Sequence, residues 1–78
     1  MRYTKHAERR LSEREIPKAW VEATVSAPDR EAPDPKNPGL TRAYKRLTEA
    51  GGRVLRVVYT RTETETLIIT AFLDRDAE

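Results

Sequence analysis

Two apolar segments separated by a short polar one place the strongest limit on how this chain can fold. Residues 53–60 (RVLRVVYT) and 66–73 (TLIITAFL) are rich in the β-branched and aromatic side chains that favour strands. The residues between them are only Arg, Thr and Glu, which predicts a polar turn. Because both segments are apolar at nearly every position, we expect central strands of an antiparallel sheet, covered on at least one face.

A third strand and an exposed connector are expected before this pair. Residues 40–48 alternate loosely between polar and apolar side chains, and Gly51 and Gly52 follow them. Glycine adopts positive φ without steric cost, so these two residues predict a tight turn. Residues 28–39 are rich in proline and charge, which predicts a connector with room for a short edge strand near residues 30–32.

The first part of the chain has the pattern of two helices. Thr4 is a good N-cap for a helix over residues 5–14, which contain no glycine, proline or β-branched residue. Pro17 fits the start of a second helix over residues 17–26, and Pro28 ends it. The apolar stripes at helical spacing are Tyr3, Ala7 and Leu11 in the first helix and Ile16, Trp20, Ala23 and Ala27 in the second, with Val21 and Val25 beside the second stripe.

These elements together predict one small α+β domain over residues 1–78. In such a fold the N-terminal helical hairpin packs on one face of a three- to four-stranded antiparallel sheet. A chain of 78 residues is too short for a second hydrophobic core.

Composition excludes several classes of function. The chain has no cysteine, one histidine and scattered acidic residues, so we expect no disulfide, no metal site and no cofactor. No apolar run reaches the length of a membrane span, so we expect a soluble, cytoplasmic protein. The formal net charge is only +2, although Arg outnumbers Lys eleven to four. Any nucleic-acid binding must therefore come from a local basic patch.

The first helix carries the only histidine beside two arginines. His6, Arg10 and Arg14 follow each other at intervals of four residues, so they form a row along one side of the helix. Nearby cations favour a neutral imidazole, which can act as a general base, while the guanidinium groups can bind a phosphate. The alternative is a partly buried histidine with arginines that extend outward and pair with glutamates.

The sheet has its own polar candidates. Arg56 interrupts an otherwise apolar strand, and Tyr59 and Thr70 are the other polar groups on the two apolar strands. With the neighbouring Tyr44, Lys45 and Arg46 they predict a basic, aromatic face for single-stranded nucleic acid. The alternative is an ordinary half-exposed sheet on which Arg56 pairs with a glutamate of another strand.

Four short motifs, taken in order, resemble a known family. They are HAxxRLxxRxI at residues 6–16, the Pro-Asp pair at 28–29, LRVVY at 55–59 and IITAF at 68–72. This order is similar to that of a large family of short bacterial proteins catalogued as a domain of unknown function. That family is related to RelE-type toxins of toxin–antitoxin systems and to the wider barnase/colicin/RelE ribonuclease fold.

The resemblance implies a RelE-like fold and, for some relatives, metal-independent cleavage of RNA. His6, Arg10, Arg14 and Thr70 match the family's motifs, and Arg56 and Tyr59 match them less closely. Together with Lys45 and Arg46 of the predicted sheet face, these residues give an expected catalytic set of His6, Arg10, Arg56 and Tyr59, and an expected RNA- or phosphate-binding set of Arg14, Lys45, Arg46 and Thr70. In this scheme His6 is the base or the acid, and Tyr59 or Lys45 is the second proton carrier. The partners expected are RNA, a cognate antitoxin protein and a second copy in a homodimer, with no membrane.

The chain also departs from RelE-type toxins. They are usually more basic and often keep a catalytic group in a C-terminal segment, whereas this chain ends in the acidic segment 74–78. Two functions therefore stay open. One is a metal-independent endoribonuclease, and the other is a non-catalytic protein- or RNA-interaction module on the same fold.

Overall fold

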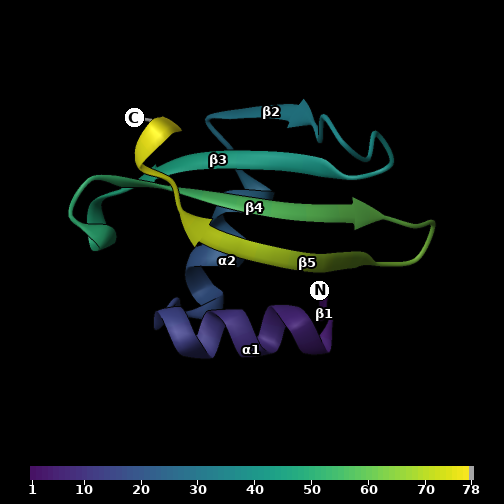
Figure 1. Ribbon diagram of the computed structural model, residues 1–78, viewed down its shortest axis with the longest axis horizontal. Coiled ribbons are helices and arrows are strands. Elements are labelled where there is room, and N and C mark those ends of the chain that lie inside the picture. The colour runs from purple at the N-terminus through teal and green to yellow at the C-terminus, as the bar shows by residue number, and fades with distance from the viewer. Residues whose placement is uncertain (78) are drawn as a thin grey trace.

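One five-stranded sheet forms the centre of the protein (Figure 1). The computed structural model describes residues 1–77. In sequence order the strands are β1 (Arg2–Tyr3), β2 (Arg30–Pro33), β3 (Thr41–Leu47), β4 (Arg53–Arg61) and β5 (Thr66–Leu73). Their order in the sheet is β1-β5-β4-β3-β2, and every neighbouring pair is antiparallel except β1 with β5, which is parallel.

The α+β class is confirmed, but the predicted sheet is too small. The prediction of three to four antiparallel strands missed β1, which has two residues and pairs in parallel with Leu67 and Ile68. A two-residue strand has no alternation to detect, so nothing in the sequence marks it. The edge strand considered near residues 30–32 is present as β2.

Two helices precede the sheet strands that they cover. α1 spans Lys5–Arg14, the predicted range, and α2 spans Lys18–Ser26, one residue shorter than predicted. The Oγ1 atom of Thr4 accepts a hydrogen bond from the Ala7 amide at 3.0 Å, as expected of an N-cap. α1 ends at Glu15, whose φ of 53° lets its amide close the last turn on the carbonyls of Leu11 and Ser12.

Two short 3₁₀ turns complete the chain. η1 (Thr48–Ala50) leads into Gly51 and Gly52, whose φ angles of 71° and 80° turn β3 back into β4. The predicted glycine turn is therefore present. η2 (Arg75–Ala77) follows β5 and folds back toward β4, where the Asp74 amide donates to the Val54 carbonyl at 2.8 Å.

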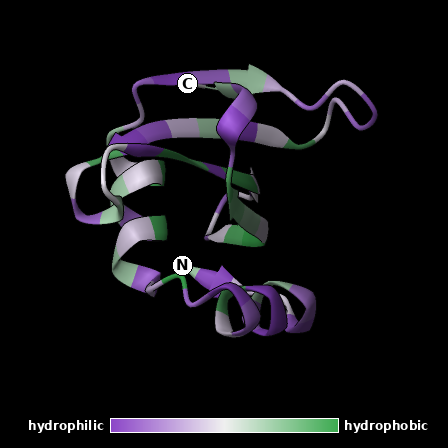
Figure 2. Cartoon of the chain, turned by 60° about the vertical axis from the view of Figure 1, so that its left-hand side comes forward, coloured by the Kyte–Doolittle hydropathy of each residue, from purple (hydrophilic) through white to green (hydrophobic). Residues whose placement is uncertain are grey.

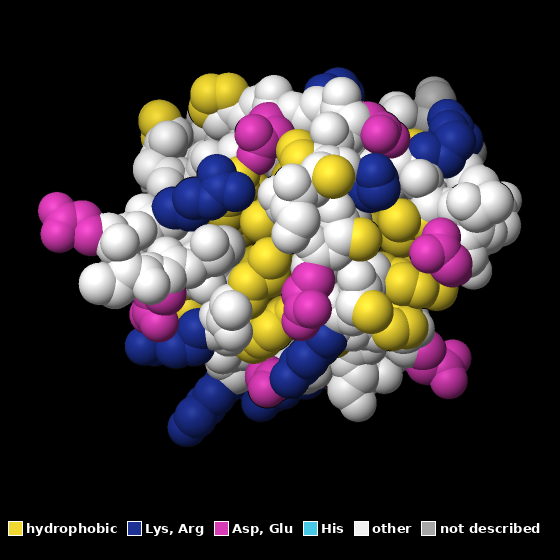
Figure 3. All heavy atoms as spheres, turned by 180° about the vertical axis from the view of Figure 1, so that it is seen from behind, with side chains coloured by type: hydrophobic (Ala, Val, Ile, Leu, Met, Phe, Trp, Pro, Cys, Tyr) yellow, Lys and Arg dark blue, Asp and Glu magenta, His cyan; other side chains and the backbone are white. Residues whose placement is uncertain are grey.

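The core lies between the helices and one face of the sheet. In Figure 1 α2 crosses behind the sheet, while α1 runs alongside β5. Figure 2 shows hydrophobic segments of the helices turned toward the strands, and Figure 3 shows a band of hydrophobic side chains on the helix side between scattered charges. The main core residues are Ala7, Leu11, Val21, Val25, Ala43, Leu55, Val57, Tyr59, Ile68 and Ala71.

The buried stripe of α2 differs from the prediction. Val21, Thr24 and Val25 are its buried residues, whereas Trp20 is only partly buried and Ala27 is exposed. The centre of the buried face is therefore the Val21 and Val25 side, which the sequence placed beside the stripe, and it packs on β4 and β3. The Thr24 hydroxyl, buried there, donates to the Trp20 carbonyl at 2.8 Å.

The outer edge of β5 is occupied by the N-terminal part of the chain. The Thr4 amide donates to the Ile68 carbonyl at 3.1 Å, and its hydroxyl donates to the Ile69 carbonyl at 3.4 Å. Arg14 Nη1 donates to the Ala71 carbonyl at 2.9 Å. None of the helices in the described part of the chain is long and apolar enough to cross a membrane.

Candidate functional site

The face of the sheet turned away from the helices carries a row of arginines and aromatic residues. Arg30, Tyr44, Arg56 and Phe72 are successive register partners in β2, β3, β4 and β5, and Arg14 reaches the Phe72 ring from the end of α1. We call these five residues the arginine–aromatic row. Because partnered positions project to the same face, guanidinium groups and aromatic rings alternate along it.

Cation–π contacts hold the row together. The guanidinium carbon of Arg30 lies 3.9 Å from the centroid of the Tyr44 ring, and that of Arg56 lies 4.2 Å from the Phe72 centroid. Arg14 lies 5.7 Å from the same Phe72 centroid. All three distances are within the range in which a cation is attracted to a ring face. Neither α1 nor α2 covers this face. The η2 turn lies at one end of it, where Ala77 adjoins Tyr44 and Val54, and Tyr44 is only 7% exposed.

Tyr44 has an unusual electrostatic environment for a tyrosine. Burial alone would raise the pKa of its hydroxyl, but hydrogen bonds and charge from Arg56 and Arg42 outweigh it. The pKa of Tyr44 is therefore lowered, because the two guanidinium groups favour the phenolate.

Two of the arginines on this face have a carboxylate partner. Arg42 Nε is 3.1 Å from Asp34 Oδ2, and Arg56 Nε is 3.5 Å from Asp74 Oδ2. Within residues 1–77, Arg56 Nε is buried without a hydrogen-bond partner, so Asp74 balances its charge but does not satisfy its donor. No carboxylate of the described residues lies within 4.0 Å of Arg14 or Arg30. The row therefore keeps cationic groups available to an anion.

Four of the predicted site residues share this face or reach it. Arg14 and Arg56 belong to the row, and Arg46 and Thr70 are register partners of Val54 and Val58 on the same face. Arg46 Nη1 donates to the Gly52 carbonyl at 2.6 Å, which places it near one end of the sheet.

Lys45 and Tyr59 lie on the opposite, helix-covered face, because consecutive strand residues alternate between faces. Lys45 Nζ donates to the Ala27 carbonyl at 2.9 Å, at the end of α2. Tyr59 is 2% exposed, and its hydroxyl donates a short hydrogen bond to Glu31. Burial and this bond raise the pKa of Tyr59. The structure does not bring either residue together with Arg56.

His6 and Arg10 are also separate from the row. His6 is exposed in the first turn of α1, eight residues before Arg14, which is about 12 Å along the helix axis. Arg10 Nη1 is paired with Glu13 Oε1 at 2.6 Å. Of His6, Arg10 and Arg14, only Arg14 belongs to the arginine–aromatic row.

Sequence reasoning missed Arg30, Arg42 and Phe72, and it grouped Tyr44 with Lys45. The alternation Arg42–Tyr44–Arg46 was the available signal, since residues two apart on a strand share a face. The alternative interpretation of Arg56 was a cross-strand pair with a glutamate, and in the structure its carboxylate partner is Asp74, which follows β5.

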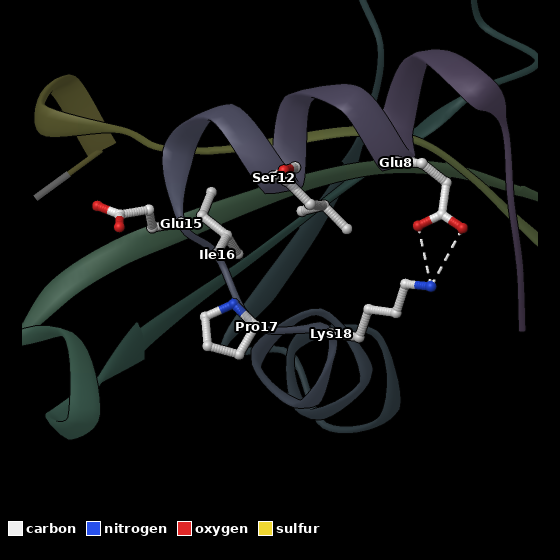
Figure 4. A pocket seen from close by; sticks show the side chains of 7 residues that line it. Glu8, Ser12, Glu15, Ile16, Pro17 and Lys18 are labelled. Atoms are coloured by element: carbon white, nitrogen blue, oxygen red, sulfur yellow. Dashed lines mark hydrogen bonds and ion pairs between the residues drawn. The ribbon is translucent and has the colours of Figure 1, made fainter.

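Several hollows adjoin these elements in the described part of the chain, among them a small one lined by Arg30 and Tyr44 of the row. A cleft of about 520 Å³ beside the row is lined by Arg14, Ile16, Phe72 and Leu73. A hollow of about 390 Å³ lies between α1 and the start of α2 (Figure 4), with Lys18 Nζ bound to Glu8 at 2.9 Å across its mouth. Residues 1–77 contain no group of three or more His, Asp or Glu side chains placed to hold a metal ion.

Comparison with known proteins gives a family but no activity. The family model described as "Domain of unknown function (DUF4258)" matches residues 3–73. No curated protein and no solved structure matches the chain. The match does not extend to RelE-type toxins, so that relation stays a resemblance. Because the matched segment runs from β1 to the last residue of β5, the chain belongs to the DUF4258 family.

Proposed function

We propose that the open face of the sheet binds single-stranded RNA in the cytoplasm, as a non-catalytic RNA-interaction module. The observation that supports this most directly is the arginine–aromatic row. Single strands are bound by neutralising the backbone and stacking bases on aromatic rings. The row supplies guanidinium groups at Arg14, Arg30 and Arg56 for the backbone and the partly exposed ring of Phe72 for stacking, while the ring of Tyr44 is buried.

The geometry favours a single strand over a duplex. Guanidinium groups and rings lie on a sheet face, and a ring on such a face can stack only on a base that is already unpaired. The small net charge of +2 gives little general attraction to duplex backbone. Binding therefore depends on the local arrangement of Arg14, Arg30 and Arg56.

Salt dependence of RNA binding tests the proposal. With three arginine contacts to phosphate, the slope of log K against log salt concentration is expected near −2, at about −0.7 for each contact on a single strand. Fluorescence anisotropy of a labelled single-stranded RNA measures this slope, with single-stranded DNA and a duplex of the same sequence as further ligands. A wild-type protein that binds none of these at low salt contradicts the proposal.

Arg30→Gln and Arg61→Gln form a matched pair of variants. Arg61 lies over Tyr59 with its guanidinium carbon 5.0 Å from the ring centroid, on the helix side of the sheet, so both changes remove one charge from a cation–π pair. We expect Arg30→Gln to weaken RNA binding and flatten the slope by about 0.7, and Arg61→Gln to leave both nearly unchanged. Equal losses in the two variants would mean that only net charge matters.

The lowered pKa of Tyr44 supports a second candidate, a metal-independent endoribonuclease on the same face. In that reaction the 2′-oxygen bonds to phosphorus and the bond to the 5′-oxygen of the next nucleotide breaks. The Tyr44 phenolate takes the proton of the 2′-hydroxyl, and water protonates the leaving oxygen. Arg56 and Arg42 then stabilise charge on the phosphate oxygens.

Cleavage of a labelled RNA in the presence of a metal chelator tests this candidate. We expect products with a 2′,3′-cyclic phosphate and a rate that rises with pH toward the pKa of Tyr44. Tyr44→Phe should abolish cleavage while keeping RNA affinity, and His6→Ala should cleave normally. If cleavage is lost in His6→Ala but kept in Tyr44→Phe, the general base is His6 of α1 and not Tyr44.

A further inference from the structure

The cleft at the end of the arginine–aromatic row has apolar walls. Its volume of about 520 Å³ is in the range of small-molecule sites. Phe72 and Leu73 come from the end of β5, and Ile16 comes from the link between the helices. Because Phe72 belongs to both the row and the cleft, a ligand lying along the row meets the cleft at its ring.

Two guanidinium groups lie close to this aromatic wall. Arg56 lies 4.2 Å from the centroid of Phe72, and Arg14 lies 5.7 Å from it. The hydrogen bond from Arg14 Nη1 to the Ala71 carbonyl, at 2.9 Å, fixes the position of this guanidinium. A guanidinium has five N–H donors, so one such bond leaves others for a ligand.

We infer that this cleft holds one unpaired base of the bound RNA, stacked against Phe72, with an adjacent phosphate on Arg14. The inference rests on the proposed function, and it adds to that function the position on the protein where one base of the RNA binds. A planar ring joined to an anion matches apolar walls next to guanidinium groups. A cationic segment of a protein partner would be repelled there.

The hollow between the two helices does not have this chemistry. Between α1 and α2, the side chains of Glu8 and Glu15 line the opening, and Glu8 is already paired with Lys18 (Figure 4). Carboxylates at an opening repel a phosphate. Of these two hollows, the cleft beside Phe72 is therefore the one suited to a nucleotide.

Abasic substitution along a short labelled RNA tests the inference in the wild-type protein. Removing one base at a time should leave most positions nearly unchanged and weaken binding roughly 5- to 150-fold at the position that fills the cleft, the range of stacking on an aromatic side chain. Phe72→Leu should lose a similar factor with intact RNA and become insensitive to the abasic site. Tyr3→Leu is the matched control, because Tyr3 also lies under a cation, with Lys18 Nζ 4.6 Å from its centroid.

Leu73→Trp gives a second route, since it fills the cleft without removing apolar surface. It should weaken binding of the intact RNA and leave the abasic RNA unaffected, and thermal melting followed by circular dichroism checks that each variant is folded.

If the wild type binds RNA but no abasic position matters, this inference is wrong and the proposed function stands. If the wild type binds no RNA, both are wrong. Variants that change self-association instead of RNA affinity would assign the cleft to a protein contact.

Discussion

At the scale of single residues, the three tyrosines of the chain are in three different environments. Burial raises the pKa of Tyr3 to about 12, with further contributions from Glu22 and Glu8. Burial and the bond to Glu31 also raise the pKa of Tyr59, whereas Arg56 and Arg42 lower that of Tyr44 despite its burial. The direction of the pKa shift of each tyrosine therefore shows whether its hydroxyl lies near arginines, as in Tyr44, or near carboxylates, as in Tyr3 and Tyr59.

A spectrophotometric titration of the folded protein should resolve this order. We expect one tyrosine to ionise below the ordinary tyrosine range and two above it, with the early step missing in Tyr44→Phe. Tyr59→Phe is the control, because it removes a late step only. A single step for all three tyrosines near pH 10 would contradict the assignment of the arginine pair to Tyr44.

At the scale of elements, Thr4 connects α1 to the sheet. Its Oγ1 caps the helix through the Ala7 amide, and its hydroxyl and amide donate to β5 carbonyls. Thr4→Ala should lower the free energy of unfolding by about 1–2 kcal/mol, the cost of losing an N-cap. Urea denaturation measures it, with Ser12→Ala, an exposed residue within the same helix, as a control that should change stability by less than about 0.5 kcal/mol.

The turn after β5 modulates the cationic face. Asp74 Oδ2 lies 3.5 Å from Arg56 Nε, while its Oδ1 accepts the Asp76 amide at 2.9 Å. Asp74→Asn keeps an oxygen for that amide but removes the charge, so RNA affinity should rise by up to roughly fivefold. Asp76→Asn makes the same charge change at an exposed position of the turn. Equal increases in the two variants would contradict a specific role for Asp74.

The sequence predicts elements better than it predicts which side chains meet. The ranges of α1 and β5 follow from local signals, namely the Thr4 cap and the run of β-branched residues. The row depends on register between β2, β3 and β4, and register is a tertiary property. Arg30 could not be placed because its partner Tyr44 lies fourteen positions away. Lys45 was misplaced because neighbours in sequence were treated as neighbours in space.

At the scale of the whole molecule, alkaline pH should weaken the fold. The folded state holds the Tyr3 proton more tightly than the unfolded state does, so this contribution is complete below pH 10 and is lost as pH rises toward 12. The unfolding free energy from urea denaturation should therefore fall across this interval. Tyr3→Phe should show a shallower fall, and an equal fall in both proteins would assign the effect to other groups.

The way α1 and β1 cover β5 has a consequence for self-association. Thr4 and Arg14 already donate to the carbonyls of Ile68, Ile69 and Ala71 at that margin, so these acceptors are not free for an incoming strand from another molecule. The opposite margin is β2, which is four residues long and ends in Pro33, a residue that cannot donate to a ladder. Fibril growth by strand addition is thus obstructed at both borders, and a small domain can keep one broad face uncovered without polymerising.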